Sequence, residues 1–405
     1  MRIAKTIIWS IVLYVFVQVL IAVMDRVSPN STIFHQTLLN GLQWLIILWV
    51  IYAVLFGWLF YRNKSARSPF AKMLVVFVLL VALAEVLCVA ALRNPGKIPG
   101  FAVRAFNQYY IHINRNVIQV VPECSEYDAN LFYKLHPSNT CTFSNVEFSN
   151  KIVSNKAGLR DDDASLAAPE IISLGDSYTL GWGVEQNECY PAKLESISGK
   201  KVLNAGMSSF GTVREMRMLS MLDTSNLKYI TIQYCANDID ENESYLKNNS
   251  QLKISSKASY DSLTAKFKWG KVYFPGKYFL TTLRFFVKEK AKEILHRKDP
   301  DNPAYSDPKK TAKIFVDILK TSPINFSKTK VIVMDMNEYE NEHPDFIKEV
   351  NTLLSDSAYS SHFNNNLQTI DISKVLDKND YYLLDGHIKA GGHEKIAAAI
   401  SKFIQ

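Results

Sequence analysis

Three long apolar stretches crowd into the first 92 residues, and they constrain the fold of the chain more than any other feature. They run from Thr6 to Met24, from Leu38 to Tyr61 and from Met73 to Leu92. Only the third carries a charged side chain, Glu85. Each stretch reaches the roughly 20 residues that an α-helix needs to cross a bilayer. The first lacks the small-residue cleavage site of a secretory signal peptide. The sequence therefore predicts a transmembrane anchor of three helices at residues 1–92.

The positive charges beside these stretches predict how the anchor is oriented. Lys and Arg precede the first stretch and fill the loop before the third, at Arg2, Lys5, Arg62, Lys64, Arg67 and Lys72. The loop between the first two stretches holds only Asp25 and Arg26 as full charges. Since short cytoplasmic flanks carry the excess of Lys and Arg, we predict a cytoplasmic N-terminus. Everything after Leu92 is then extracytoplasmic, in the periplasm or outside the cell, and Glu85 should face water or a neighbouring span.

The distribution of charges and of His and Cys residues argues against two kinds of ligand, nucleic acids and metal ions or cofactors. The formal net charge is +7, and the basic residues are scattered, with no basic run interleaved with aromatic residues. Proteins that bind nucleic acids concentrate such charge in a patch, so we expect no nucleic-acid partner. No group of His and Cys has the spacing of a metal site, and we expect neither a metal ion nor an organic cofactor.

The five cysteines fall into three groups. Cys88 lies in the third apolar stretch. Cys124 and Cys141 flank an irregular segment rich in Pro, Asn and Ser, and in an oxidising compartment they form a possible disulfide, the alternative being two unrelated thiols. Cys189 and Cys235 stand among apolar residues, which is typical of buried thiols.

The rest of the chain changes character near residue 170. We interpret residues 93–169 as an extracytoplasmic connector with some β-structure, and residues 170–405 as the catalytic domain. In that domain short β-branched runs alternate with helical stretches, as in parallel sheets buried on both faces. The runs are Glu170–Leu174, Lys201–Leu203, Tyr229–Tyr234, Lys330–Met336 and Leu367–Ile372. The pattern predicts an α/β fold, a flavodoxin-like three-layer sandwich with about five parallel strands.

A helical insertion interrupts this alternation at about residues 240–325. Within it, Tyr278–Arg297 places apolar residues at helical spacing opposite several lysines. Such a basic amphipathic helix either lies on an anionic membrane surface or packs its apolar side on its own domain, and both interpretations stay open.

The first candidate catalytic residues come directly after the first predicted strand of the domain, at Gly175-Asp-Ser-Tyr-Thr179. A serine hydroxyl is a weak nucleophile unless a histidine removes its proton and a carboxylate orients that histidine. A serine where a strand opens into a helix suits this task, because its own N–H can face a developing oxyanion. The alternative is that Gly-Asp-Ser is only a turn with a helix cap.

Three later blocks supply complementary groups. Asn204-Ala-Gly206 follows the second strand, Cys235-Ala-Asn-Asp238 follows the third, and Asp385-Gly-His387 precedes the last helix. All of them lie at C-terminal strand ends or in late loops, where open parallel sheets place their ligand crevices. Asp176 and Asp238 are expected to hold turns through hydrogen bonds to the backbone.

In this order the four blocks resemble the SGNH hydrolase superfamily, also called GDSL esterases and lipases, over about residues 170–405. The resemblance implies Ser177 as the nucleophile, His387 as its general base and Asp385 as the residue that orients His387. It also implies an oxyanion hole formed by the N–H groups of Ser177 and Gly206 and by the side chain of Asn237.

Two positions depart from the family pattern. Cys235 stands where the third block of the family has glycine, and Asp385 precedes the histidine by two residues where many members use three, which puts its reach in doubt. His393 is a rival base that we expect to cap or pack at a helix start. Ser177 lacks the G-x-S-x-G motif of an α/β-hydrolase nucleophile elbow.

We therefore expect a membrane-anchored serine esterase or acylhydrolase that cleaves carboxylic esters on cell-envelope material through an acyl-serine intermediate. Its substrate would be an ester-bearing glycan or lipid. Two alternatives stay open. One is an O-acyltransferase that passes an acyl group to a cell-surface glycan beside a membrane acyltransferase partner, and the other is a non-catalytic binding module.

Overall fold

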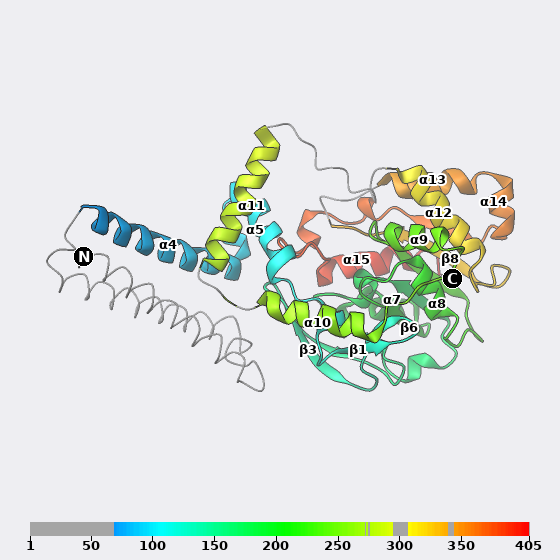
Figure 1. The fold of residues 1–405 in the computed structure, drawn as a ribbon. Coiled ribbons are helices and arrows are strands. Elements are labelled where there is room, and N and C mark those ends of the chain that lie inside the picture. Colours follow the sequence, from blue (N-terminus) through cyan, green and yellow to red (C-terminus); the bar gives the residue numbers. More distant parts are fainter. Residues whose placement is uncertain (1–68, 272, 274–275, 295–306, 339–343, 405) are drawn as a thin grey trace. The chain divides into compact units, whose positions relative to one another are not determined.

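A computed structural model describes residues 69–271, 273, 276–294, 307–338 and 344–404 (Figure 1). The first two predicted spans lie outside these residues. The chain divides into two compact units. The helical unit contains the described residues up to Ile113 together with Trp269–Ala291. The sheet unit contains Asn114–Lys268 and the described residues from Lys292 onward.

The helical unit is built from α4 (Pro69–Arg93), α5 (Gly100–Tyr109) and most of α11 (Lys277–Ile294). The predicted third span lies within α4. Among the residues that the structure describes, no helix is both long enough and apolar enough to cross a membrane. The three-helix transmembrane anchor therefore remains a prediction.

Glu85, which we expected to face water or a neighbouring span, contacts the start of another helix in the structure. Its side chain is buried, and its carboxylate accepts the backbone N–H groups of Tyr278 and Phe279 at 3.1 and 2.6 Å. The first N–H groups of a helix have no partner within the helix and favour a negative charge. The sequence could not show this contact, because α11 begins nearly two hundred residues after Glu85.

The central sheet of the other unit has five parallel strands in the order β6-β5-β7-β8-β9, which confirms the predicted α/β fold. The strands are β5 (Ile171–Gly175), β6 (Val202–Gly206), β7 (Tyr229–Tyr234), β8 (Lys330–Asp335) and β9 (Leu367–Ile370). Each of them coincides with one of the five apolar runs. The side chains of β5, β6 and β7 are all buried, since helices cover both faces of the sheet.

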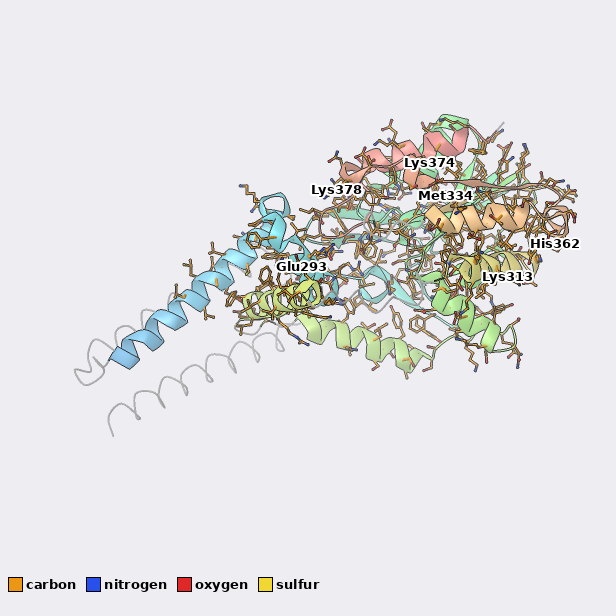
Figure 2. All side chains as sticks on the ribbon, turned by 90° about the horizontal axis from the view of Figure 1, so that it is seen from above. Glu293, Lys313, Met334, His362, Lys374 and Lys378 are labelled. Atoms are coloured by element: carbon orange, nitrogen blue, oxygen red, sulfur yellow. A yellow bond between two sulfur atoms is a disulfide. The ribbon has the colours of Figure 1, made fainter. Side chains whose placement is uncertain are left out.

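Helices form the two outer layers. The helices of this part of the chain are α6 (Ser177–Leu180), α7 (Tyr190–Ser198), α8 (Thr212–Leu219), α9 (Asp238–Lys247), α10 (Lys257–Lys271), α12 (Pro308–Lys320), α13 (Pro344–Leu354), α14 (Ser357–His362) and α15 (Ala390–Ser401). Side chains from α8, α12 and α13 share one apolar core with Ile172 and Leu174. Side chains from α7 and α15 share a second core with Ile171 and with Met334, which Figure 2 labels on β8. Successive side chains of a strand thus pack into opposite cores.

Two antiparallel hairpins precede the central sheet. They pair β1 (Ser125–Asp128) with β2 (Phe132–Leu135), and β3 (Thr140–Ser144) with β4 (Ser149–Val153). Their buried side chains, such as Tyr133 and Phe143, belong to the same core as the central strands. The predicted boundary at residue 169 therefore falls inside a unit, because the hairpins share the core of the sheet. Residues 93–113 of the predicted connector belong instead to the helical unit.

Cys124 and Cys141 form the disulfide that we considered possible, with Cα atoms 5.4 Å apart. The bond joins the residue before β1 to β3, so it links the two hairpins. Cys189 and Cys235 are buried free thiols, as expected.

Candidate active site

Ser177 begins α6, directly after the turn that ends β5. The turn needs a glycine, since Gly175 has φ 153° and an added Cβ would lie 2.1 Å from Thr179 Oγ1. Asp176 caps the helix, and its carboxylate accepts the N–H of Tyr178 at 3.0 Å. The turn-and-cap interpretation of Gly-Asp-Ser is thus correct for Asp176, and the cap fixes the backbone from which the Ser177 side chain projects.

The order of the strands places this turn where open parallel sheets bind ligands. The chain moves from β5 to β6 on one side and then returns to β7 on the other side of β5. In open parallel sheets, ligands bind outside the carboxyl ends of the strands where the winding reverses in this way. Ser177 follows the carboxyl end of β5 and therefore lies at that point.

His387 meets Ser177 at this edge, although 210 residues separate them in the chain. His387 Nε2 lies 2.8 Å from Ser177 Oγ, and His387 Nδ1 is hydrogen-bonded to Asp385 Oδ1. Asp385 is fully buried, and Ser177 and His387 are each 7% exposed. The hydroxyl, the imidazole and the carboxylate thus form a continuous hydrogen-bonded line.

A tight loop resolves the doubt about the spacing between Asp385 and His387. The N–H of Tyr382 donates to the carbonyl of His387 at 2.9 Å, and the N–H of Gly386 donates back to the carbonyl of Tyr382 at 3.2 Å. The loop folds its two ends together, and a separation of two residues then suffices for the carboxylate to reach the imidazole.

Two aromatic rings hold the imidazole in place. The ring of Trp182 stacks on His387 with centroids 4.8 Å apart and planes 16° apart. The ring of Tyr178 lies 4.7 Å from the imidazole, with its plane tilted by 30°. Both rings come from α6 or the loop after it, so the segment that carries Ser177 also orients its partner.

His393, the rival base, is bonded away from Ser177. Its side chain is buried, and its Nδ1 accepts the backbone N–H of Tyr190 at 3.2 Å. Burial lowers the pKa of His393 to about 3, so the imidazole stays neutral in the folded protein. His393 packs between α15 and α7, as the sequence analysis expected.

The predicted oxyanion hole is only partly consistent with the structure. The Gly206 N–H donates to Asn204 Oδ1 at 3.0 Å in the arrangement described, so its part in an oxyanion hole stays a prediction. Gly206 also serves close packing, because an added Cβ would lie 2.3 Å from the backbone nitrogen of Leu180 in α6. Asn237 is exposed, and its amide makes a long hydrogen bond of 3.5 Å to Asp176 Oδ2.

Three carboxyl groups of the sheet unit are buried, those of Asp176, Asp238 and Glu215. Asp176 holds the α6 cap, and Asp238 accepts both the N–H and the hydroxyl of Thr212, at 3.1 and 2.9 Å. Glu215 of α8 is 1% exposed. Burial raises the pKa of all three groups, and the charge of Asp238 adds to the effect at Glu215. Within the described ranges no three His, Cys, Asp or Glu side chains are arranged to hold a metal ion.

Sequence reasoning missed two residues that brace the site. The Glu147 carboxylate accepts the N–H groups of Leu383, Leu384 and Asp385. The Arg160 guanidinium donates to carbonyl oxygens in the loop that carries Trp182. Arg160 precedes three aspartates in a segment that reads as a solvated turn, and nothing near Glu147 in the sequence marks it.

Comparisons with known proteins complete the description. No protein-family model matches the chain, and no curated protein matches it either. Several solved structures align with it, among them the following three. One is described as a lipolytic protein of the G-D-S-L family from Desulfitobacterium hafniense DCB-2, at 14% identity over 58% of this chain and 98% of that one, with a TM-score of 0.28. Another is described as an arylesterase from Agrobacterium tumefaciens str. C58, at 13% identity over 58% and 97%, with a TM-score of 0.30.

The third is the lipase Lip_vut3 from a goat rumen metagenome, at 17% identity over 57% of this chain and 95% of that one, with a TM-score of 0.27. These structural neighbours are lipolytic proteins. They share only 13–17% of their residues with this chain.

Proposed function

We propose that this protein is a serine ester hydrolase in which Ser177 is the nucleophile, His387 the general base and Asp385 the residue that orients the imidazole. One observation carries the proposal, the 2.8 Å approach of His387 Nε2 to Ser177 Oγ with Asp385 bonded to the opposite ring nitrogen. With the Nδ1 proton held by the carboxylate, Nε2 is free of its proton and can accept that of the serine.

The reaction then proceeds through two tetrahedral intermediates. His387 takes the Ser177 proton while Oγ attacks the ester carbonyl, and it returns that proton to the departing alcohol oxygen as the first intermediate collapses. Water next loses a proton to His387 and attacks the acyl-serine. The proton returns to Ser177 Oγ as the carboxylic acid leaves, which restores the enzyme.

We propose that the N–H of Ser177 and the amide of Asn237 stabilise the oxyanion. The N–H of Ser177 belongs to the first turn of α6, where the helix itself does not use it. Asn237 is exposed, and its bond to Asp176 is long and therefore weak, so the amide can turn toward a bound substrate at little cost. Donors aimed at the developing charge supply a large part of the rate enhancement in acyl transfer.

We propose that the substrate is an ester-bearing glycan or lipid of the cell envelope and that residues 1–92 anchor the enzyme in the membrane. The three apolar stretches support the anchor. The helical unit also exposes leucines that a soluble surface would not gather, at Leu80, Leu83 and Leu87 of α4 and Leu280 and Leu283 of α11. Resistance of the chain to carbonate extraction from membranes tests this proposal, and release into the soluble fraction would contradict it.

The activity is tested with the full chain purified in detergent. Hydrolysis of p-nitrophenyl acetate and labelling by a fluorophosphonate probe should both be lost in Ser177→Ala and His387→Ala. Ser220→Ala, an exposed serine on the sheet unit, is the matched control and should behave as the wild type does. Probe labelling that survives in Ser177→Ala would remove Ser177 from its role, and a wild-type protein that is never labelled would favour a binding module.

Transfer to a sugar hydroxyl uses the same acyl-serine, and the products distinguish it from hydrolysis. With an ester donor and a glycan acceptor, hydrolysis releases one free acid for each alcohol. Acylated glycan that accumulates without free acid would favour an O-acyltransferase working beside a membrane acyltransferase partner.

A further inference from the structure

Three consecutive backbone N–H groups of the histidine loop point to one side chain. The N–H of Leu383 donates to Glu147 Oε1 at 2.9 Å, and those of Leu384 and Asp385 donate to Glu147 Oε2 at 2.8 Å each. Successive N–H groups in a turn form a concavity that binds anions, and here a carboxylate of the chain itself occupies it. The contact joins residues about 240 positions apart.

The β3–β4 hairpin delivers Glu147 to this loop. Glu147 lies in the hairpin turn, which the N–H of Asn145 closes by donating to the carbonyl of Phe148 at 2.9 Å. Asn116 holds the turn from outside, since its N–H donates to Asn145 Oδ1 at 2.6 Å and its side-chain amide donates to the carbonyl of Ser144 at 2.6 Å. The carboxylate is therefore presented on a rigid support.

The aromatic neighbour of Glu147 reinforces the contact. The ring of Phe148 lies 5.5 Å from Tyr382, at the start of the histidine loop, and 6.3 Å from Trp182, which stacks on His387. The hairpin thus touches both segments that hold the imidazole.

Asp385 connects the Glu147 contact to His387. Its N–H donates to Glu147, and its carboxylate is bonded to His387 Nδ1. Any movement of its backbone shifts the carboxylate and, through it, the imidazole that faces Ser177. Hydrogen bonds to a charged acceptor are about twice as strong as neutral ones, so three of them hold the loop firmly.

We propose that Glu147 is a positioning residue that fixes the Asp385–His387 pair against Ser177, and this inference rests on the proposed function. Glu147 reaches the backbone of the histidine loop and acts through Asp385, without contact to the reacting atoms. The hairpins before residue 170 are on this view part of the catalytic apparatus.

The experiment compares Glu147→Gln and Glu147→Ala with Glu123→Gln in the full chain in detergent. Glu123 is an exposed glutamate next to Cys124, in the same part of the chain as the hairpins, and is the matched control. Glutamine keeps one acceptor oxygen and sets an NH2 group against the remaining N–H donors, while alanine leaves all three without their acceptor. The measurements are kcat and KM for p-nitrophenyl acetate, the rate of fluorophosphonate labelling and the midpoint of thermal unfolding.

We expect kcat to fall about 10-fold in Glu147→Gln and about 100-fold in Glu147→Ala, since a small misplacement of a catalytic group costs on this order. KM should stay within about twofold of the wild type, since the carboxylate is bonded to backbone of the same chain and the substrate is bound elsewhere. Labelling of Ser177 should slow in parallel with kcat, and Glu123→Gln should match the wild type.

The results that would refute the positioning role differ from the result that would refute the proposed function. Wild-type kcat in both Glu147 variants, with Ser177→Ala inactive, would overturn the positioning role and leave the proposed function standing. Parallel losses of kcat, of substrate affinity and of the unfolding midpoint would overturn it as well, because they indicate general loss of structure. Absence of any Ser177 labelling in the wild type would instead refute the proposed function, and the positioning role with it.

Discussion

Replacement of the buried Arg160 by methionine should destabilise the sheet unit more than replacement of an exposed arginine by methionine. The guanidinium is 1% exposed and donates to four carbonyl oxygens in two separate segments. The acceptors lie at 3.1, 3.2, 2.5 and 2.7 Å on Lys151, Leu180, Gly181 and Val184 respectively. Methionine fills a similar volume and donates nothing, so all four carbonyls lose a donor.

The magnitude follows from the number of these bonds. A hydrogen bond within a protein contributes about 1 kcal/mol net, and a buried group left without a partner costs about 1–3 kcal/mol. Four lost bonds therefore predict a loss of about 4 kcal/mol in the free energy of unfolding. Arg160→Lys keeps the charge but concentrates three protons on one nitrogen, which cannot span four acceptors, and it should fall between methionine and the wild type.

The assay is urea unfolding of the full chain in detergent, followed by tryptophan fluorescence, because Trp182 lies in the loop that Arg160 holds. The matched control is Arg217→Met, since Arg217 is exposed and makes a single bond of 3.3 Å to Asn130. It should stay within about 0.5 kcal/mol of the wild type.

Hydrolysis should also fall in Arg160→Met under conditions in which the protein is folded, because the loop presses Trp182 onto His387. A loss of less than about 1 kcal/mol in Arg160→Met would refute the estimate, since it would mean that the four carbonyls find other partners at no cost.

Three further changes have expected outcomes. Removal of the disulfide by Cys124→Ser with Cys141→Ser should lower the free energy of unfolding by about 3 kcal/mol, the loop-entropy value for a bridge across 17 positions, as measured by urea unfolding; an unchanged midpoint would contradict it. Asp385→Asn should lower kcat about 10⁴-fold with KM little changed, because the amide favours the imidazole tautomer of His387 that cannot accept the serine proton, and steady-state kinetics checks this. Burial raises the pKa of Glu215 well above its value in the unfolded chain, so the folded state retains a proton that the unfolded state loses as the pH rises. The contribution of Glu215 to the free energy of unfolding therefore falls as the pH rises above the pKa of an unfolded glutamate, about 4.3. Glu215→Gln should make the unfolding midpoint less dependent on pH above that value, and an unchanged pH dependence would contradict the assignment.

The central sheet was predictable because its signal is local. Short runs such as Tyr229–Tyr234 are apolar and β-branched because they are buried on both faces, and each became a strand within a few residues of its predicted ends. The turn at Gly175 was also readable, because the approach of backbone and side chain there excludes any residue but glycine.

The domain boundary and the oxyanion donors were less predictable. The hairpins read as a connector, because short, half-exposed strands such as β1 and β3 carry no strong apolar pattern of their own. The partner of the Gly206 N–H was unpredictable for another reason. Which acceptor an N–H meets depends on neighbouring side chains, and here Asn204, two residues earlier, meets it first.

The sequence by itself determined which segments become the strands of the central sheet, that the fold is α/β, and which side chains stand at the carboxyl ends of those strands. These properties depend on residue type and spacing over a few positions, where hydrophobic burial and turn geometry act. Only the tertiary structure decided that Glu147 holds the histidine loop, that Arg160 holds the Trp182 loop and that Glu85 caps α11. Each of these is a single charged side chain meeting backbone groups, and a backbone N–H or carbonyl looks the same in every residue, so the sequence carries no mark of the partner.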